Sequence, residues 1–442
     1  MMRLRKTPSE IMRIFCLFRQ HHLSYNLFKC EHIFEGANKN LDILFETTRD
    51  YATASHLLEK EGYVLYLPER IEKYKKMYTL FRDGVATRIH LHREIAWHGL
   101  KVLDKKQIFS RAERLSDVIF VPSSEDRLLI HSAHVIFENF VVSDAVGVLI
   151  KDLLGKKRDW NYIRGIVKKE NWNSAFEHVL LSIRKNKQPD KRYLAFAFVK
   201  KVLITPSSWL PLTRKMVSIM LRRFSLRRNG RLIALIGVNG AGKTTLTKKL
   251  LEAYAPLSRT VNGQFGYYFG WVPFSPVSKF ASQRLKKKRK SIFKEINAGQ
   301  SRLVQEAFFL VNYIEYLLRY IRFVWPQLRR NKLVITDRYF YDLYGQYQHS
   351  PKSWLLPLLL HIYPKPDFLF VLDADLKTLQ ARGKLGEQRT VKDISDLEGQ
   401  RQRYLFLARQ RGGTVIKTNN LDENVRAIIE QSWRMLINPS LS

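Results

Sequence analysis

Apolar residues in the second half of the chain fall into short runs that are separated by segments with helical spacing. The runs LIALI, LVITD, DFLFVLDAD and TVIKT each predict a strand. Strands that alternate with helices are typical of a parallel sheet covered by helices. After Gly230 the sequence therefore predicts an α/β fold with a doubly wound parallel sheet.

The first half shows a different pattern. Residues 41–47 and 86–95 predict strands, and residues 51–63 between them predict a helix. From about 123 to 201, apolar residues recur at spacings of three and four, which indicates helices. We therefore expect an α+β domain with a helical extension.

A domain boundary is expected between these two halves. Residues 205–229 contain two prolines and a basic end, and a glycine follows just before the first strong apolar run. Such a composition is typical of a connecting segment. The predicted organisation is a first domain at 1–204, a basic linker at 205–229 and a second domain at 230–442.

The longest mainly apolar stretch, residues 303–325, does not predict a membrane span. A spanning helix needs about 18 or more apolar residues, and polar side chains interrupt this stretch. They are Gln305, Glu306, Asn312, Glu315, Arg319 and Arg322. Their spacing predicts an amphipathic helix packed on a core.

The compartment is indicated by the N-terminus and the cysteines. The first residues carry charge but no uninterrupted apolar centre, so no secretion signal is expected. Two cysteines, Cys16 and Cys30, cannot form a disulfide framework or a four-thiolate zinc site. We expect inert thiols and a cytoplasmic protein.

The chain is strongly basic, with a net charge of +36. The excess is spread over both halves, and its one dense run, residues 284–294, is more typical of a solvated helix face or loop than of a nucleic-acid reader. Non-specific contact with polyanions is therefore expected, and sequence-specific nucleic-acid binding is not.

The clearest motif is GVNGAGKT, which fits the phosphate-binding pattern G-x-x-x-x-G-K-[ST]. A predicted strand leads into it and a predicted helix follows, as the pattern requires. Its glycines allow the backbone to wrap a phosphate, and its amides and the helix N-terminus favour negative charge. The predicted nucleotide-binding residues are Gly237, Asn239, Gly240, Ala241, Gly242, Lys243, Thr244 and Thr245.

This motif also predicts the cofactors. Lys243 is expected to bridge the β- and γ-phosphates of ATP, and the Thr244 hydroxyl to bind Mg²⁺. A second signal, Asp337 followed by Arg338, ends a predicted strand, where ligands of open α/β sheets bind. Asp337 is predicted to hold the same metal ion and Arg338 to contact a phosphate, with a structural ion pair as the alternative.

The segments GVNGAGKTT, TDRYFYDLYGQYQ and KPDFLFVLDADLKTLQARG resemble the thymidylate kinase family of P-loop nucleoside-monophosphate kinases, over residues 230–436. The resemblance implies ATP- and Mg²⁺-dependent phosphoryl transfer to a nucleoside monophosphate, dTMP or similar, or to another small phosphorylated acceptor. It places metal and acceptor-phosphate binding on Asp337 and Arg338. It also implies a mobile lid with Arg382 and Arg389, adenine contacts at Asn419 and Asn420, and a possible homodimer.

The acceptor region departs from the family pattern. Residues 260–276 have neither the arginine nor the Glu-Pro step of true thymidylate kinases. They offer Tyr267, Tyr268, Phe269 and Trp271, which could contact an acceptor or belong to the core, and the core is favoured. The chain is in this respect more similar to thymidylate-kinase-like proteins with DRYxxDL motifs, so the acceptor stays open.

In the first domain, the segments HIFEGANKNLDILFE and ATRIHLHREIAWHG resemble the uncharacterised nucleotidyltransferase-like family, over roughly residues 24–153. The family's three metal-binding carboxylates correspond to Asn40, Asp42 and His90, so only one carboxylate remains. This implies a degenerate transferase fold without activity, with an active transferase as the alternative. A zinc site at His90, His92 and His98 is disfavoured, because the histidines alternate on a strand and have no thiol partners.

Two interpretations of the whole protein follow. The first is the ATP-dependent kinase, in which Lys243, Arg338, Arg382 and Arg389 neutralise charge while Asp337 and Thr244 hold the metal. The second is a nucleotide-gated regulator or scaffold that acts through its basic surface with little turnover. Acceptor-dependent ADP formation would distinguish them.

Overall fold

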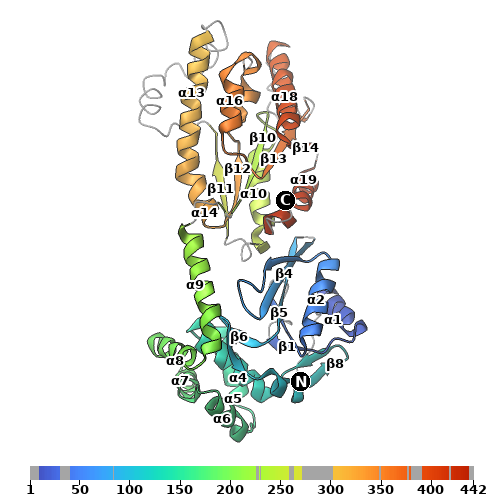
Figure 1. The fold of residues 1–442 in the computed structure, drawn as a ribbon. Coiled ribbons are helices and arrows are strands. Elements are labelled where there is room, and N and C mark those ends of the chain that lie inside the picture. The colour runs from blue at the N-terminus through green and yellow to red at the C-terminus, as the bar shows by residue number, and fades with distance from the viewer. Residues whose placement is uncertain are drawn as a thin grey trace. The chain divides into compact units, whose positions relative to one another are not determined.

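The computed structural model describes residues 9–29, 40–82, 84–224, 228, 230–257, 263–270, 302–347, 350–375, 378–379, 391–417 and 420–437. The chain divides into two compact units, Met1–Ser225 and Leu226–Ser442. Figure 1 shows the two units, each with its own sheet. Among the described residues, no helix combines the length and the apolar character that crossing a membrane requires.

The second unit is built on a five-stranded parallel sheet with the order β11-β12-β10-β13-β14. Its strands are β10 (Arg231–Gly237), β11 (Gln264–Tyr268), β12 (Leu333–Asp337), β13 (Phe368–Asp373) and β14 (Thr414–Lys417). The first strand lies in the centre and successive strands are added on both sides of it, so the predicted doubly wound parallel sheet is confirmed.

Helices connect these parallel strands, as crossover connections require. They are α10 (Lys243–Ala253), α13 (Arg302–Arg319), α14 (Trp325–Arg329), α15 (Asp342–Gln346), α16 (Leu355–Ile362) and α18 (Val391–Arg411), with the π-helical turn η4 (Tyr320–Val324) and the 3₁₀ turns η3 (Ala255–Leu257) and η5 (Ser350–Lys352). Helix α19 (Leu421–Ile437) follows the last strand. α10 packs against β10, β11, β12 and α19, whereas α18 contacts β13, β14 and α15.

Helix α13 confirms the predicted helix, and four of the six polar residues that interrupt the apolar stretch are buried. Glu306, Asn312, Glu315 and Arg319 are all buried. The Glu306 carboxylate accepts hydrogen bonds from the Ser353 hydroxyl at 2.6 Å and from two backbone amides at the start of α16. Buried polar groups are tolerated when they are hydrogen-bonded, so Glu306 joins α13 to the start of α16 rather than facing water.

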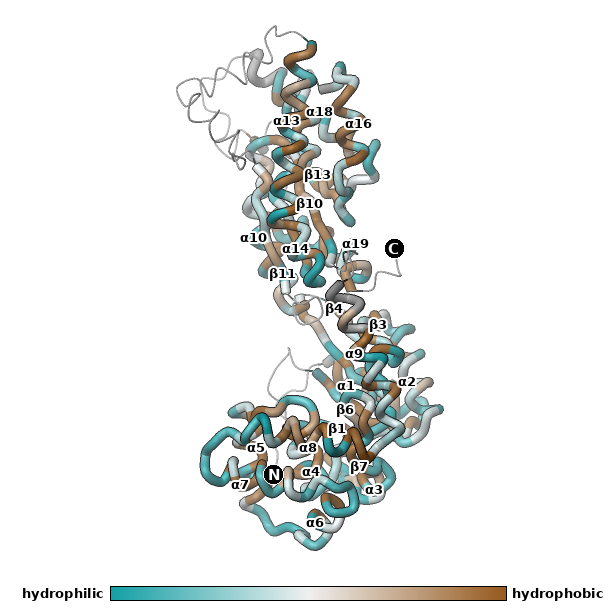
Figure 2. Tube along the Cα trace, turned by 60° about the vertical axis from the view of Figure 1, so that its left-hand side comes forward, coloured by the Kyte–Doolittle hydropathy of each residue, from teal (hydrophilic) through white to brown (hydrophobic). Residues whose placement is uncertain are grey.

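The opposite face of α13 is exposed and apolar. Its exposed side chains are Leu303, Val304, Leu310, Val311, Ile314 and Leu318, and Ile321 continues the row in η4. Hydrophobic and hydrophilic residues are interspersed along this helix (Figure 2). Spacing alone therefore predicted the helix correctly but did not show which of its residues are buried.

The first unit contains a five-stranded sheet with the order β1-β2-β5-β4-β3, in which only β2 and β5 are parallel. The strands are β1 (Tyr25–Lys29), β2 (Asn40–Phe45), β3 (Val64–Leu67), β4 (Lys75–Arg82) and β5 (Val85–His92). Helix α2 (Thr48–Lys60) follows β2 and begins with the Thr47 hydroxyl accepting a bond from the Asp50 amide at 3.0 Å. The predicted strand–helix–strand pattern is confirmed.

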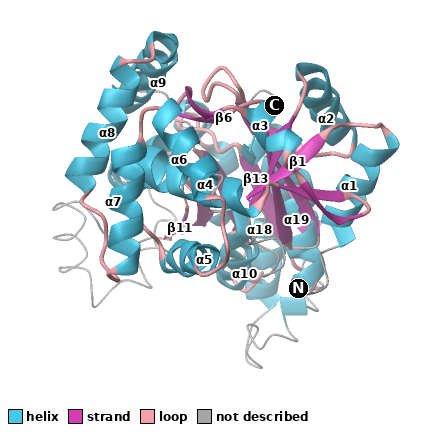
Figure 3. Ribbon diagram, turned by 90° about the horizontal axis from the view of Figure 1, so that it is seen from below, coloured by secondary structure: helices cyan, strands magenta, loops and turns pink. Residues whose placement is uncertain are grey.

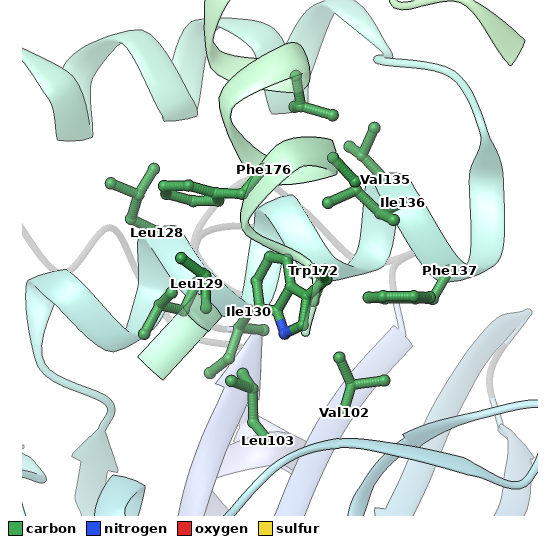
Figure 4. Close-up of a cluster of buried hydrophobic side chains, with 14 of the residues drawn as sticks. Val102, Leu103, Leu128, Leu129, Ile130, Val135, Ile136, Phe137, Trp172 and Phe176 are labelled. Atoms are coloured by element: carbon green, nitrogen blue, oxygen red, sulfur yellow. The ribbon is translucent and has the colours of Figure 1, made fainter. Parts of the chain in front are cut away.

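The predicted helical extension is also confirmed. It comprises α4 (Ser124–His134), the π-helical turn η1 (Val135–Asn139), α5 (Asp144–Leu154), α6 (Trp160–Lys169), α7 (Asn173–Arg184) and α8 (Lys191–Leu203). Figure 3 shows α6, α7 and α8 gathered beside α4. Trp172 lies in the shared core beside Phe137 and Phe176, with ring centroids 5.8 and 5.7 Å away (Figure 4).

The remaining elements of this unit surround the sheet. They are α1 (Ser9–Gln20), α3 (Lys105–Ser110), α9 (Trp209–Phe224), the 3₁₀ turn η2 (Pro206–Ser208) and two hairpins, β6 (Ile95–Trp97) with β7 (Leu100–Leu103) and β8 (Glu113–Ser116) with β9 (Ile119–Val121). Helix α9 occupies most of the predicted linker. Its Lys215 ammonium contacts the Glu72 carboxylate and lies 2.6 Å from His98 Nδ1, so this segment packs on the first unit.

Candidate nucleotide site

The phosphate-binding motif forms a tight loop between β10 and α10. Gly237, Gly240 and Gly242 have φ values of 146°, 91° and 92°, which side chains other than glycine rarely adopt. A Cβ on Gly237 would lie 2.5 Å from the Leu372 carbonyl oxygen of β13. The glycines therefore serve both the turn and the close approach of two strands.

Lys243, the first residue of α10, is folded back across this loop. Its ammonium donates hydrogen bonds of 2.8 Å to the carbonyl groups of Gly237 and Val238. Burial lowers the pKa of Lys243 to about 8, against the opposing effect of Asp342. The lysine is thus a desolvated cation whose charge responds to nearby anions.

Thr244 and Asp337 meet at the carboxyl end of the central strands. The Thr244 hydroxyl donates a hydrogen bond to Asp337 Oδ2. Within the described part of the chain, Asp337 Oδ1 is buried and has no hydrogen-bond partner. An unpartnered carboxylate oxygen beside a hydroxyl is a donor set that suits Mg²⁺, which prefers oxygen ligands, so these two residues fit the predicted metal.

Arg338 follows directly and has an unusual backbone. Its φ of 74° is rare for a residue with a side chain and typical of functional positions. The guanidinium donates to Asp342 Oδ2 at 3.1 Å and to the Asn239 side chain in the phosphate loop. Burial opposes the charged form, but Asp342 raises the pKa of Arg338, so the arginine stays charged.

Two residues that the sequence analysis missed hold this arginine. Asp342 is almost fully buried, and the Tyr404 hydroxyl of α18 donates to its Oδ1 at 3.0 Å. Tyr404 lies 66 residues beyond Arg338 in the chain, so no local pattern could have linked them. Asp342 is the second aspartate of the DRYxxDL motif, four residues after Arg338, and this motif was the sequence signal for it.

These groups line one cavity of about 500 Å³. The phosphate loop and the start of α10 supply Gly240 to Leu246, and the strand ends supply Tyr268, Asp337, Arg338 and Leu372, while Leu421 and Asn424 come from α19. Carboxylate, hydroxyl, lysine and arginine thus converge on one space large enough for a small ligand. Such an arrangement can bind a polyphosphate with its metal ion and position a second anion.

Comparisons with known proteins find similar sequences for the second half of the chain. The family model described as Thymidylate kinase matches residues 278–429. The second half of the chain carries a thymidylate kinase-like phosphotransferase domain. A probable thymidylate kinase of Methanosarcina acetivorans is 29% identical over 188 residues, 40% of this chain and 82% of that protein. The thymidylate kinase of Mycoplasma pneumoniae is 25% identical over 226 residues, 49% of this chain and 100% of that protein.

A solved structure is also similar. The thymidylate kinase from Ehrlichia chaffeensis aligns with a TM-score of 0.32 at 19% identity, covering 46% of this chain and 97% of that chain. A likeness at this TM-score supports no inference about the kinase-like domain.

The aromatic residues of the kinase-like domain divide between core and cavity. Phe269 is fully buried and stacks on Tyr316 at 5.9 Å, and Tyr267 stacks on Phe323 at 5.3 Å. Tyr268 is instead 51% exposed and lines the cavity. The favoured core assignment therefore describes Phe269, whereas Tyr268 faces the cavity and Trp271 lies outside the described residues.

The remaining predicted residues of the kinase-like domain are less informative. Arg382, Arg389 and Asn419 lie outside the described residues. The Asn420 side chain accepts a hydrogen bond from the Asp422 amide at 3.0 Å and so belongs to the start of α19. Asn424, one turn further along α19, is the asparagine that lines the cavity.

In the first unit, two of the three positions of the predicted degenerate transferase meet, Asp42 and His90, whereas Asn40 contacts Arg88. Asn40 accepts a hydrogen bond from Arg88 at 2.8 Å, and Asp42 Oδ1 lies 3.1 Å from His90 Nδ1. His92 Nε2 is 2.8 Å from the same oxygen. The pattern of histidines without thiol partners did not include the Asp42 carboxylate, which the neighbouring strand places beside His90 and His92. The transferase resemblance itself stays a prediction.

Proposed function

We propose that the protein transfers the γ-phosphoryl group of ATP to a nucleoside monophosphate, dTMP or similar, or to another small phosphorylated acceptor. The observation that carries the proposal is the convergence of Lys243, Asp337 and Arg338 on one cavity of the kinase-like domain. The similar proteins described above are named thymidylate kinases, which supports a nucleotide as the acceptor.

The residues would share the work of charge neutralisation. Lys243 would exchange its loop carbonyls for phosphate oxygens, and Arg338 would hold the acceptor phosphate. Mg²⁺, held through Thr244 and Asp337, would supply electrostatic stabilisation of the transferred group. Arg382 and Arg389 are proposed to close over the site as a lid, which excludes water.

The acceptor is proposed to lie beside Tyr268. This ring folds over Gly270, where a Cβ would come within 1.9 Å of it, and it lines the cavity together with Arg338. An aromatic face offers stacking to a base, while the arginine offers a donor fork to a phosphate. A nucleoside monophosphate has both features, which is why we favour it over a phosphorylated sugar.

We further propose that two copies of the chain pair through the exposed face of α13. Val304, Ala307, Val311, Ile314, Leu318 and Ile321 repeat at alternating spacings of three and four residues, the pattern of a coiled-coil seam. Trp354, Leu358 and Ile362 of the neighbouring α16 are also exposed. If each large side chain contributes on the order of 100 Å², the patch reaches the ~800 Å² per partner of a standard interface.

A second copy is favoured over another partner because the seam carries no charge. The chain as a whole has a net charge of +36, so most contacts between copies would be repulsive. The apolar seam avoids this repulsion. In a twofold dimer the same surface patch of both copies is in contact, so the seam of one copy would pack against the seam of the other.

The alternative function is a nucleotide-gated regulator or scaffold that binds ATP and turns over slowly. ADP release with ATP and Mg²⁺ across dTMP, dUMP, other nucleoside monophosphates and phosphorylated sugars distinguishes the two. We expect stimulation by one nucleoside monophosphate, reduced roughly 100-fold or more in Lys243→Ala. ATP binding without stimulation by any acceptor would favour the regulator.

A further inference from the structure

A cluster of buried polar side chains lies on one face of the sheet in the first unit, outside the kinase-like domain. Asp42 on β2 is directly opposite His90 on the parallel strand β5, and His92 follows two residues later. Residues two apart on a strand point to the same face. Adjacent strands therefore place one carboxylate and two imidazoles together.

The geometry points to a binding site for one transition-metal ion of the zinc class, formed by Asp42, His90 and His92. One donor atom from each side chain lies within 4.8 Å of the others. Asp42 Oδ1 is 3.1 Å from His90 Nδ1 and 2.8 Å from His92 Nε2. Two ligands of a tetrahedral Zn²⁺ at about 2.0–2.1 Å lie roughly 3.3 Å apart, so these two pairs need to open only slightly.

The choice of metal follows from the donor atoms. Mg²⁺ and Ca²⁺ take oxygen ligands, whereas two imidazoles and a carboxylate suit zinc and similar ions. Three protein ligands leave a coordination position for a small molecule, as in catalytic zinc sites. This assignment differs from a two-magnesium site, which requires more carboxylates than this cluster offers.

The surroundings hold the two histidines in place. The Tyr66 hydroxyl of β3 lies 3.1 Å from His90 Nε2, and a polar partner on the outer nitrogen fixes the orientation of a ligating imidazole. The His92 ring packs on Phe28 at 4.8 Å between centroids. Within the described residues, His92 Nδ1 is buried without a hydrogen-bond partner. Burial of this nitrogen without a partner costs free energy, and the bond from His92 Nε2 to Asp42 does not offset that cost.

Two lysines border the cluster and set its expected affinity. Lys29 of β1 pairs with Asp42 across the sheet, and the buried Lys75 of β4 pairs with His92. Their positive charges oppose a divalent cation, although Glu138 lies 3.9 Å from the Lys29 ammonium. Removal of the Lys75 charge should therefore tighten metal binding, an effect that a purely structural cluster would not show.

The test uses the full-length chain, stripped with a chelator and free of nucleotide and magnesium. Zn²⁺ bound after gel filtration is counted by mass spectrometry, and Co²⁺ serves as a spectroscopic probe. We expect one ion per chain, lost in His92→Gln and Asp42→Asn but kept in the buried control His131→Gln and in Asp337→Asn. The Co²⁺ spectrum should show d–d bands without the charge-transfer band of a thiolate.

Substoichiometric metal in the wild type, or full binding by His92→Gln and Asp42→Asn, would overturn the assignment. If those two variants do not fold, Lys75→Met decides the question. Its affinity for Zn²⁺ should be roughly tenfold higher than that of the wild type. An unchanged or weaker affinity would contradict a metal site beside Lys75.

Discussion

At the scale of single residues, Lys243 is held as a cation by two carbonyl groups of its own loop. Burial has already lowered its pKa to about 8, so its protonation depends on what else is bound. Phosphate oxygens would raise this pKa again, because opposite charges favour the charged form. Nucleotide binding and proton uptake should therefore be linked.

This linkage predicts a pH-dependent affinity for ATP. Below about pH 8 Lys243 is already protonated, so ATP binding takes up no proton. Above about pH 8 Lys243 is mostly neutral, so it must take up a proton when ATP binds. The affinity should fall as the pH rises above about 8, by up to about tenfold per pH unit. Calorimetry with Mg²⁺-ATP between pH 7 and 9.5 measures it, and Lys243→Ala should bind weakly with a flat profile. A flat wild-type profile would contradict the linkage.

Tyr404 is predicted to act on the site through Asp342. Burial raises the pKa of Asp342, and the Tyr404 hydroxyl and Arg338 both oppose this rise. In Tyr404→Phe the pKa should rise further, so Asp342 becomes protonated and releases Arg338 at a higher pH. The acidic limb of the kcat/KM profile should move to higher pH, and stability should fall by about 1.5–3 kcal/mol.

The control for this variant is Tyr254→Phe, which removes a buried hydroxyl bonded to Ser432 away from the cavity. It should cost stability without moving the pH profile. Equal profiles for Tyr404→Phe and the wild type would show that Tyr404 is only structural.

At the scale of elements, the end of strand β11 depends on α13. The Arg319 guanidinium donates to the carbonyl groups of Tyr268 and Gly270, each at 2.9 Å. These residues carry the aromatic side of the cavity, so one buried arginine links a helix to the proposed acceptor side. Arg319 therefore faces inward because it binds the carbonyl groups at the end of β11.

Arg319→Met should loosen this segment. Carbonyl groups that lose a charged donor cost roughly 1–3 kcal/mol, so we expect a lower Tm and a higher KM for the acceptor with little change in the KM for ATP. The matched control is Arg322→Met, which removes an exposed arginine from the same helical segment. Equal effects on the KM of both substrates would mean that Arg319 does not act through the acceptor side.

At the scale of the whole molecule, the exposed seam of α13 predicts a dimer. Ile314→Glu and Leu318→Glu place acidic groups in the middle of an apolar contact, where two copies would face each other. Light scattering at micromolar concentration should show a dimer for the wild type and a monomer for both variants. Leu181→Glu, an equally exposed leucine of the first unit, should leave the dimer intact. A monomeric wild type would refute the pairing.

Features that depend on neighbours along the chain could be predicted without the structure. The phosphate loop is one continuous segment, so the spacing of its glycines and Lys243 was sufficient to predict it. Asp337 and Arg338 likewise follow one another at the end of one strand. Alternation of apolar runs and helical spacing fixed the parallel sheet of the second unit, because each strand must bury both faces.

Contacts between residues that are distant in the chain could not be predicted in this way. Tyr404 reaches Asp342 across 62 residues, and His92 reaches Asp42 across 50. The polar face of α13 turned inward because Glu306 and Arg319 find backbone partners there, and hydropathy cannot foresee such partners. A hydrophobic pattern records the average tendency of a residue to be buried, whereas hydrogen-bond partners from elsewhere in the chain decide whether a particular polar residue can be.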